Sequence, residues 1–167
     1  AAARAAYAER FAGEDVLVVH GDIVTTTSVL GAFLDGFADS ELEAGALLVA
    51  LGDDDPGNWI CGSLSNGLLT DVKGHPRGGS HRLAGVYALR ASAADCLTRN
   101  PGFAARVDVG GMPPPESDMA GSMQVLLDDD RDVFAQEAGD FLIDMDKPWH
   151  VLQANARMVE HLCSQIE

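Results

Sequence analysis

The sequence predicts a three-layer α/β domain in which helices cover both faces of a mixed, mostly parallel sheet. Short unbroken apolar runs at 16–19 and 46–51 are typical of strands that are buried on both faces, as in parallel sheets. Helical segments alternate with these runs, which is the order expected of a sheet between two helical layers. The 167 residues contain no interdomain linker, so residues 1–167 are expected to form a single domain.

The first elements follow from composition and helix-end signals. Residues 2–12 have helical composition, and Gly13 is a natural stop. The strand at 16–19 runs into His20-Gly21-Asp22. The threonines at 25–27 offer N-caps to the next helix. That helix is expected to place a set of apolar side chains on one face: Val29, Leu30, Phe33, Leu34 and Phe37.

The middle of the chain is predicted to form a hairpin. Asn66-Gly67 separates the extended runs 59–64 and 68–72, and Asn-Gly between two strands favours a tight turn. Residues 73–81 are expected to be a loop. The remaining predicted elements are a strand at 82–89, a short helix near 92–98, a helix capped near Ser117 and ending about Leu127, strands at 132–136 and 141–144, and a long helix from Pro148 onward.

Charge and hydropathy exclude several kinds of partner. The formal net charge of −15 disfavours nucleic acids and anionic membranes, because both are polyanions. No apolar run approaches the roughly 20 residues of a membrane helix. The chain has three cysteines at wide spacing and no secretory signal, so we expect reduced thiols and a cytoplasmic location.

Two aspartates occupy positions that suit a metal site. Asp22 follows the strand at 16–19, and Asp144 ends the strand at 141–144. Ligands bind at the carboxyl ends of strands in open α/β sheets, where one or two carboxylates with substrate phosphates can hold Mg²⁺. The alternatives are a turn residue for Asp22 and, for Asp144, an acid beside a helix N-terminus.

Basic residues near the hairpin are candidates for anion contacts. Lys73 follows the second strand of the hairpin and could meet a phosphate as a point charge, or it is an ordinary loop lysine. Arg77 and Arg82 flank Gly78-Gly79 and could also meet an anion. Gly-x-Gly-x-x-Gly, Walker-type and Gly-x-Ser-x-Gly motifs do not occur in the sequence.

Taken in order, the motifs resemble those of the sugar-1-phosphate nucleotidylyltransferases, the group of glucose-1-phosphate thymidylyltransferase, N-acetylglucosamine-1-phosphate uridylyltransferase and mannose-1-phosphate guanylyltransferase. Five stretches, which together span nearly the whole chain, carry the resemblance: Asp15 to Asp22, Asp55-Pro56-Gly57-Asn58-Trp59, Asn66 to Lys73, Leu83-Ala84-Gly85-Val86-Tyr87, and Asp144 to Trp149 with Gln153-Ala154-Asn155.

The resemblance implies a Rossmann-like nucleotide-diphospho-sugar transferase fold and a reaction. A sugar 1-phosphate would attack the α-phosphate of a nucleoside triphosphate, giving a nucleotide sugar and pyrophosphate, as in phosphoryl transfer dominated by positioning and charge neutralisation. By position, Asp22 and Asp144 would hold Mg²⁺, with Asp22 and Lys73 catalytic. The resemblance also implies a set of substrate-binding residues: Gly21, Trp59, Lys73, Gly85 and Tyr87.

The sequence also departs from the family pattern. The glycine-rich loop that cradles the triphosphate is absent, Ile60 replaces a glycine, Val72 a glutamate and Leu83 an asparagine. We therefore expect an N-terminally incomplete domain that is inactive as this chain. A sheet edge exposed in this way offers a route to a homo-oligomer. The alternative is a non-catalytic nucleotide-sugar-binding or regulatory module of the same fold.

Overall fold

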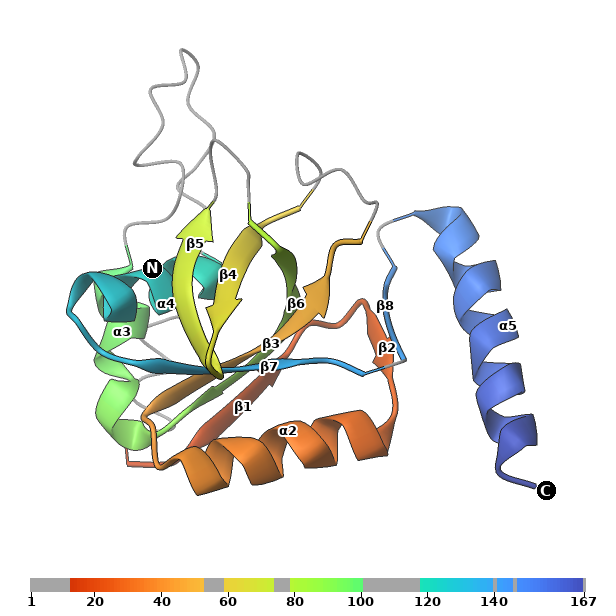
Figure 1. The fold of residues 1–167 in the computed structure, drawn as a ribbon, viewed down its shortest axis with the longest axis horizontal. Coiled ribbons are helices and arrows are strands. Elements are labelled where there is room, and N and C mark those ends of the chain that lie inside the picture. The colour runs from red at the N-terminus through yellow and green to blue at the C-terminus, as the bar shows by residue number, and fades with distance from the viewer. Residues whose placement is uncertain are drawn as a thin grey trace, which may run out of the picture.

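The computed structural model describes residues 13–52, 59–73, 79–100, 118–139, 141–145 and 147–166. Figure 1 shows a central sheet with α2 on one face, α3 and α4 on the other, and α5 standing beside the body. The elements run in the order β1 Val16–Val19, β2 Ile23–Thr25, α2 Thr27–Ser40, β3 Ala44–Ala50, β4 Cys61–Ser65, β5 Leu68–Lys73, β6 His81–Leu89, a 3₁₀ turn Ala91–Ala93, α3 Asp95–Arg99, α4 Met119–Asp128, β7 Val133–Glu137, β8 Leu142–Asp144 and α5 Pro148–Ser164.

The three-layer α/β class predicted from the sequence is confirmed, with one correction to the sheet. The six-stranded sheet has the order β1-β6-β3-β7-β5-β4, and β2 and β8 form a separate two-stranded ribbon. The sheet is mixed, but it is not mostly parallel. Among the described strands, β3 and β7 form the one parallel pair, and every other pairing is antiparallel. An apolar run favours burial but carries no information about strand direction, which depends on partners far away in sequence.

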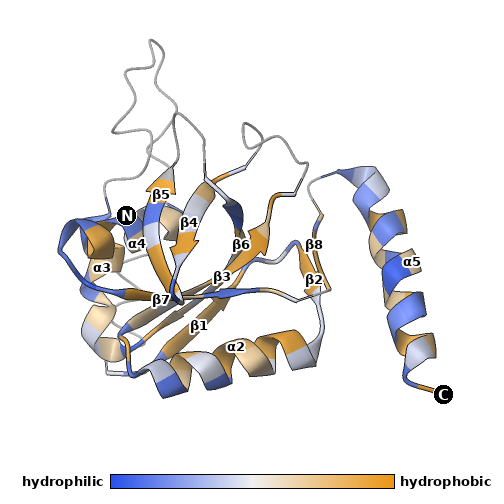
Figure 2. Ribbon diagram, in the orientation of Figure 1, coloured by the Kyte–Doolittle hydropathy of each residue, from blue (hydrophilic) through white to orange (hydrophobic). Residues whose placement is uncertain are grey.

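Two apolar cores lie on opposite faces of the sheet because side chains alternate along each strand. On β3, Leu48 belongs to the core under α3 and α4, whereas the neighbouring Leu47 belongs to the core under α2. On β6, Tyr87 and Val86 divide in the same way. The strands between the helices are correspondingly hydrophobic in Figure 2. Burial on both faces explains why the sequence of β3 is apolar without interruption.

Strand β1 does not have the double burial that its sequence predicts. It lies at the end of the sheet and pairs antiparallel with β6. Its residues alternate between half-buried and exposed, and Leu17 and Val19 are 40% and 41% exposed. An end strand packs fewer neighbours than a central one, so an apolar run alone does not guarantee burial. Among the described strands, β1 has a single partner, β6, and the exposed edge left by a missing strand stays a prediction.

Turn and capping residues in the sequence predicted most of the other elements correctly. Asn66 and Gly67 have φ values of 52° and 77°, as a tight hairpin turn between β4 and β5 requires. Thr26 caps α2 by accepting a hydrogen bond from the Val29 amide at 3.3 Å. Asp118, rather than Ser117, caps α4. Leu34 is 38% exposed, which differs from its expected place on the apolar face of α2.

Two sequence expectations fall wholly or largely outside the described residues. The helix expected at 2–12 lies outside them, and so does most of the loop expected at 73–81. Strand β2 was missed because its three residues are too few to show a periodic pattern.

In the described part of the chain, no helix combines the length and the apolar character needed to cross a membrane.

Candidate functional site

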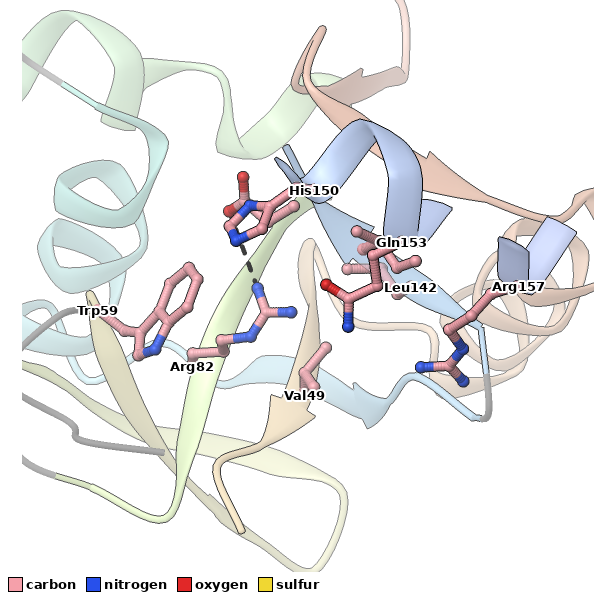
Figure 3. Close-up of a pocket in the computed structure, with 9 residues that line it drawn as sticks. Val49, Trp59, Arg82, Leu142, His150, Gln153 and Arg157 are labelled. Carbon is pink, nitrogen blue, oxygen red and sulfur yellow. Dashed lines mark ion pairs between the residues drawn. The ribbon is translucent and has the colours of Figure 1, made fainter. Parts of the chain in front are cut away.

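A cleft of about 320 Å³ separates the sheet from the N-terminal half of α5. Strands β3, β6 and β8 form one wall, and α5 forms the other, as Figure 3 shows. Cationic, amide and aromatic side chains dominate a lining that contains a single acid. The lining residues are Val49, Trp59, Arg82, Leu142, Ile143, Asp144, His150, Gln153 and Arg157.

Arg82 is the most buried charged residue of the cleft, with 7% of the residue exposed. Its place on β6 is fixed by pairing with Val49 on β3 and Cys61 on β4. Its guanidinium lies 4.5 Å from the centre of the Trp59 ring, a cation–π distance. Nη1 is 3.8 Å from Oδ2 of Asp144 (Figure 3). The indole and the carboxylate together offset the cost of burying this charge.

Helix α5 supplies the polar wall through His150, Gln153 and Arg157. Their spacing of three and four residues puts them on one helical face, and Figure 3 shows them directed toward the cleft. The backbone N–H of Lys147 donates to Nδ1 of His150 at 3.3 Å. With Nδ1 accepting, the proton of the neutral ring sits on Nε2, which leaves a donor there. The Arg157 guanidinium lies 5.8 Å from the ring centre of Phe141.

Of the two aspartates predicted as metal ligands, Asp144 ends β8, and Asp22 lies in the turn just before β2. β2 pairs with β8 so that Ile23 faces Asp144, and the Met145 amide donates to the Asp22 carbonyl oxygen at 2.9 Å. Among the described residues, no group of three His, Cys, Asp or Glu side chains could hold a metal by itself. Mg²⁺ commonly takes one or two carboxylates and completes its shell with phosphate oxygens and water. Asp22 and Asp144 supply the type of donor that such an ion takes, and their shared role as its ligands stays a prediction.

Gly85 and Tyr87 lie on β6 beside His20, outside the cleft. Gly85 has a φ of 71°, and a Cβ atom there would come 2.9 Å from Nδ1 of His20. The His20 amide donates to the Gly85 carbonyl oxygen at 2.9 Å. Tyr87 is 2% exposed, and burial, followed by the charge of Asp118, raises the pKa of its hydroxyl above the usual range. Each of the two residues therefore also has a structural role.

The remaining predicted residues are dispersed. Lys73 ends β5 opposite Cys61, and its side chain lies outside the described part. Gly21 sits in the turn before β2, where a Cβ atom would meet nothing within 4 Å. The cleft thus brings together Trp59 and Asp144 from the predicted set. His150, Gln153 and Arg157 were missed, although polar residues at helical spacing on one face of α5 were a readable signal.

The fold defines the class of protein that the chain resembles. Searches with the sequence matched no family model and no curated protein. The structure, in contrast, matches solved sugar-1-phosphate and related nucleotidyltransferases, and the chain has their Rossmann-like α/β fold.

Three solved structures illustrate the match. A UDP-glucose pyrophosphorylase from Acinetobacter baumannii matches with a TM-score of 0.67 and 14% identity over 95% of this chain and 59% of its own. An inositol-1-phosphate CTP transferase from T. maritima gives 0.65 and 13% over 89% and 58%. A Bacillus anthracis protein described as a glucose-1-phosphate thymidylyltransferase, in complex with a sucrose, gives 0.67 and 17% over 90% and 57%. The chain therefore spans less than two thirds of each.

Replacing Gly85 with alanine is expected to lower the free energy of unfolding by about 1–3 kcal/mol, since a side chain at positive φ is strained and would also press on His20. Urea denaturation measures this loss. Gly31 of α2 is the matched control, because a Cβ atom there meets nothing within 4 Å. Gly31→Ala should leave stability unchanged or raise it by about 0.5–1 kcal/mol. Equal effects at the two glycines would contradict the assignment of a structural role to Gly85.

Proposed function

We propose that the chain is part of an enzyme that transfers a nucleotidyl group from a nucleoside triphosphate to a sugar 1-phosphate, releasing pyrophosphate. The observation that supports this most is the pairing of β2 with β8, which brings the turn that carries Asp22, just before β2, next to Asp144 at the end of β8. The fold shared with solved nucleotidyltransferases supports the same class of reaction.

In this proposal, Asp22 and Asp144 hold Mg²⁺, which when bound neutralises charge on the reacting phosphates. Asp22 and Lys73 are the catalytic pair, with Lys73 binding the sugar phosphate. Gly21 and Gly85 let backbone approach the substrates, and Trp59 and Tyr87 border the sugar. The residues thereby contribute orientation and charge balance, which are the main requirements of phosphoryl transfer.

A second candidate is a non-catalytic module that binds a nucleotide sugar or regulates a partner. The contact between Arg82 and Asp144 favours it, because a guanidinium 3.8 Å from Oδ2 already neutralises one of the two proposed metal ligands. The sequence departures at Ile60 and Leu83 point the same way. Association through the exposed edge of β1 would suit either candidate.

Thermal shift with nucleoside triphosphates, sugar 1-phosphates and nucleotide sugars, with Mg²⁺ or with EDTA, tests the proposal. Ligand at about 100 times its Kd stabilises the folded state by about 2.7 kcal/mol. We expect Mg²⁺-dependent stabilisation that Asp144→Asn abolishes. Asp35→Asn, on the exposed side of α2, is the control for lost charge and should respond like the wild type.

The outcomes separate the two candidates. Pyrophosphate release in the presence of Mg²⁺ supports the enzyme and contradicts the expectation that this chain is inactive by itself. Binding of a nucleotide sugar that does not depend on Mg²⁺ supports the module. Ligand-induced stabilisation that is the same in EDTA as in Mg²⁺, or that persists in Asp144→Asn, would contradict the proposed metal site.

A further inference from the structure

Helix α5 packs against the body through one narrow face. Ala154 is its single buried residue, and the ring centre of His161, on the same face, lies 5.5 Å from that of Phe141. His150 and Met158 are half-buried. Their positions recur at intervals of three and four residues, which defines the side of α5 that faces the protein. Figure 1 shows α5 standing beside the body, with its far side open to solvent.

The opposite side of α5 carries an apolar seam. Its residues are spaced alternately by three and four positions: Trp149, Leu152, Ala156, Val159 and Cys163. All five are exposed, among them Leu152 at 73% and Val159 at 59%. Alternating steps of three and four residues are the a and d positions of a coiled coil, so this pattern favours another helix as the partner. At 3.6 residues per turn the seam lies opposite Ala154, and the described body leaves it uncovered.

The seam is neutral, although the chain has 26 acids and 11 lysines and arginines. In a coiled coil the residues beside the a and d positions would be Gln153, Asn155, Glu160 and Leu162. Glu160 is the one charge among these four. Two copies of the chain can therefore meet along this face without gathering like charges at the contact.

We propose that two copies of this chain pair through the seam, α5 against α5, in a reversible two-fold dimer. The seam presents the same apolar pattern on both copies, as a two-fold interface requires. Each body packs on the side of α5 that faces away from the seam, so the two bodies lie outside the helix pair and do not collide. With 17 residues, α5 is about 25 Å long, which is short for a stable interface and gives a weak dimer.

A second copy suits this face better than a lipid surface does. Helices that lie in a membrane interface are rich in Lys and Arg on their polar side, whereas Arg157 is the only such residue in α5. The dimer also goes beyond the proposed transfer reaction, because the seam contains none of the residues that line the cleft. Failure of either proposal would therefore leave the other standing.

Sedimentation velocity of the full chain over a range of protein concentrations tests the inference. We expect a monomer in dilute solution and a dimer in concentrated solution. Raising NaCl from about 0.1 M to about 1 M should strengthen the dimer severalfold, because salt screens the repulsion between two bodies that each carry a net charge of −15. A dimer that weakens with salt would be held by ionic contacts, and that result would overturn the inference.

Replacing Leu152 and Val159 together with glutamine should weaken the dimer by about tenfold or more, because each loses apolar burial while the net charge stays the same. Both side chains are exposed, so the variant is expected to fold, and circular dichroism checks this. Val151→Gln is the matched control. Val151 is 48% exposed on the same helix but lies outside the seam, so this variant should dimerise like the wild type.

The fluorescence of Trp149, which is 64% exposed, reports on the seam itself. Its emission should move to shorter wavelength as the dimer forms, and the Leu152→Gln, Val159→Gln variant should lose this shift. A chain that stays monomeric at every concentration would overturn the inference. A dimer that the double variant retains would use another surface, such as the edge of β1, and would also overturn it. The same holds for a monomer that binds phosphatidylcholine vesicles through Trp149.

Discussion

Replacing Phe33 with alanine is expected to lower the free energy of unfolding by about 3–5 kcal/mol, more than a hundredfold in the folding equilibrium. Phe33 is fully buried and lies with Phe37 and Phe134 in the core under α2, with ring centres 6.5 and 6.0 Å away. The sheet is tightly packed beneath this cluster, because a Cβ atom at Gly45 would come 2.9 Å from Phe37. The surrounding residues therefore have little room to collapse into the cavity.

Urea denaturation measures this loss as a lower midpoint with an unchanged slope. Leu34→Ala provides the matched control, because Leu34 is the next residue of α2 and is 38% exposed. We expect that change to cost less than about 1 kcal/mol. Similar losses at the two positions would show that α2 does not pack as described.

The buried thiol of Cys96 is expected to react with alkylating reagents at least 100 times more slowly than the exposed thiol of Cys163 at pH 8. Burial first, and then the charge of Asp95, raises the pKa of Cys96 to about 11. Only about one such thiol in a thousand is ionised at pH 8, against about a quarter for free cysteine. Burial also blocks the reagent, which widens the difference.

Mass spectrometry of peptides after timed exposure to iodoacetamide measures both rates in one sample. Cys163→Ser should remove the fast-labelled peptide and leave Cys96 unlabelled until denaturant is added. Rapid labelling of Cys96 in the native protein would mean that the core between the sheet and α4 is open.

The sequence predicted those elements whose signals are local. Asn66 and Gly67 adopt the positive φ values that place the β4–β5 hairpin, and Thr26 caps α2 as the threonines at 25–27 suggested. The helix from Pro148 begins at its first-turn proline. These features depend on neighbours a few residues away, so the sequence carries them directly.

The candidate site was only half predictable, for a physical reason. Strand ends pointed to Asp144, and the resemblance pointed to Trp59, both of which line the cleft. Arg82 was noticed only as a residue flanking a loop. No local sequence signal indicated that His150 on α5 would face Arg82, because the direction of His150 depends on how α5 packs against the rest of the protein.

By itself, the sequence determined the α/β class, the hairpin and most helix ends, since backbone propensity and capping act over a few residues. The tertiary structure alone decided that β1 is an end strand, that antiparallel pairs dominate the sheet, and that β2 joins β8. It also decided that Arg82 and α5 share a cleft. Each of these depends on contacts between distant segments, whose free energies come from which surfaces meet rather than from the pattern of any one segment.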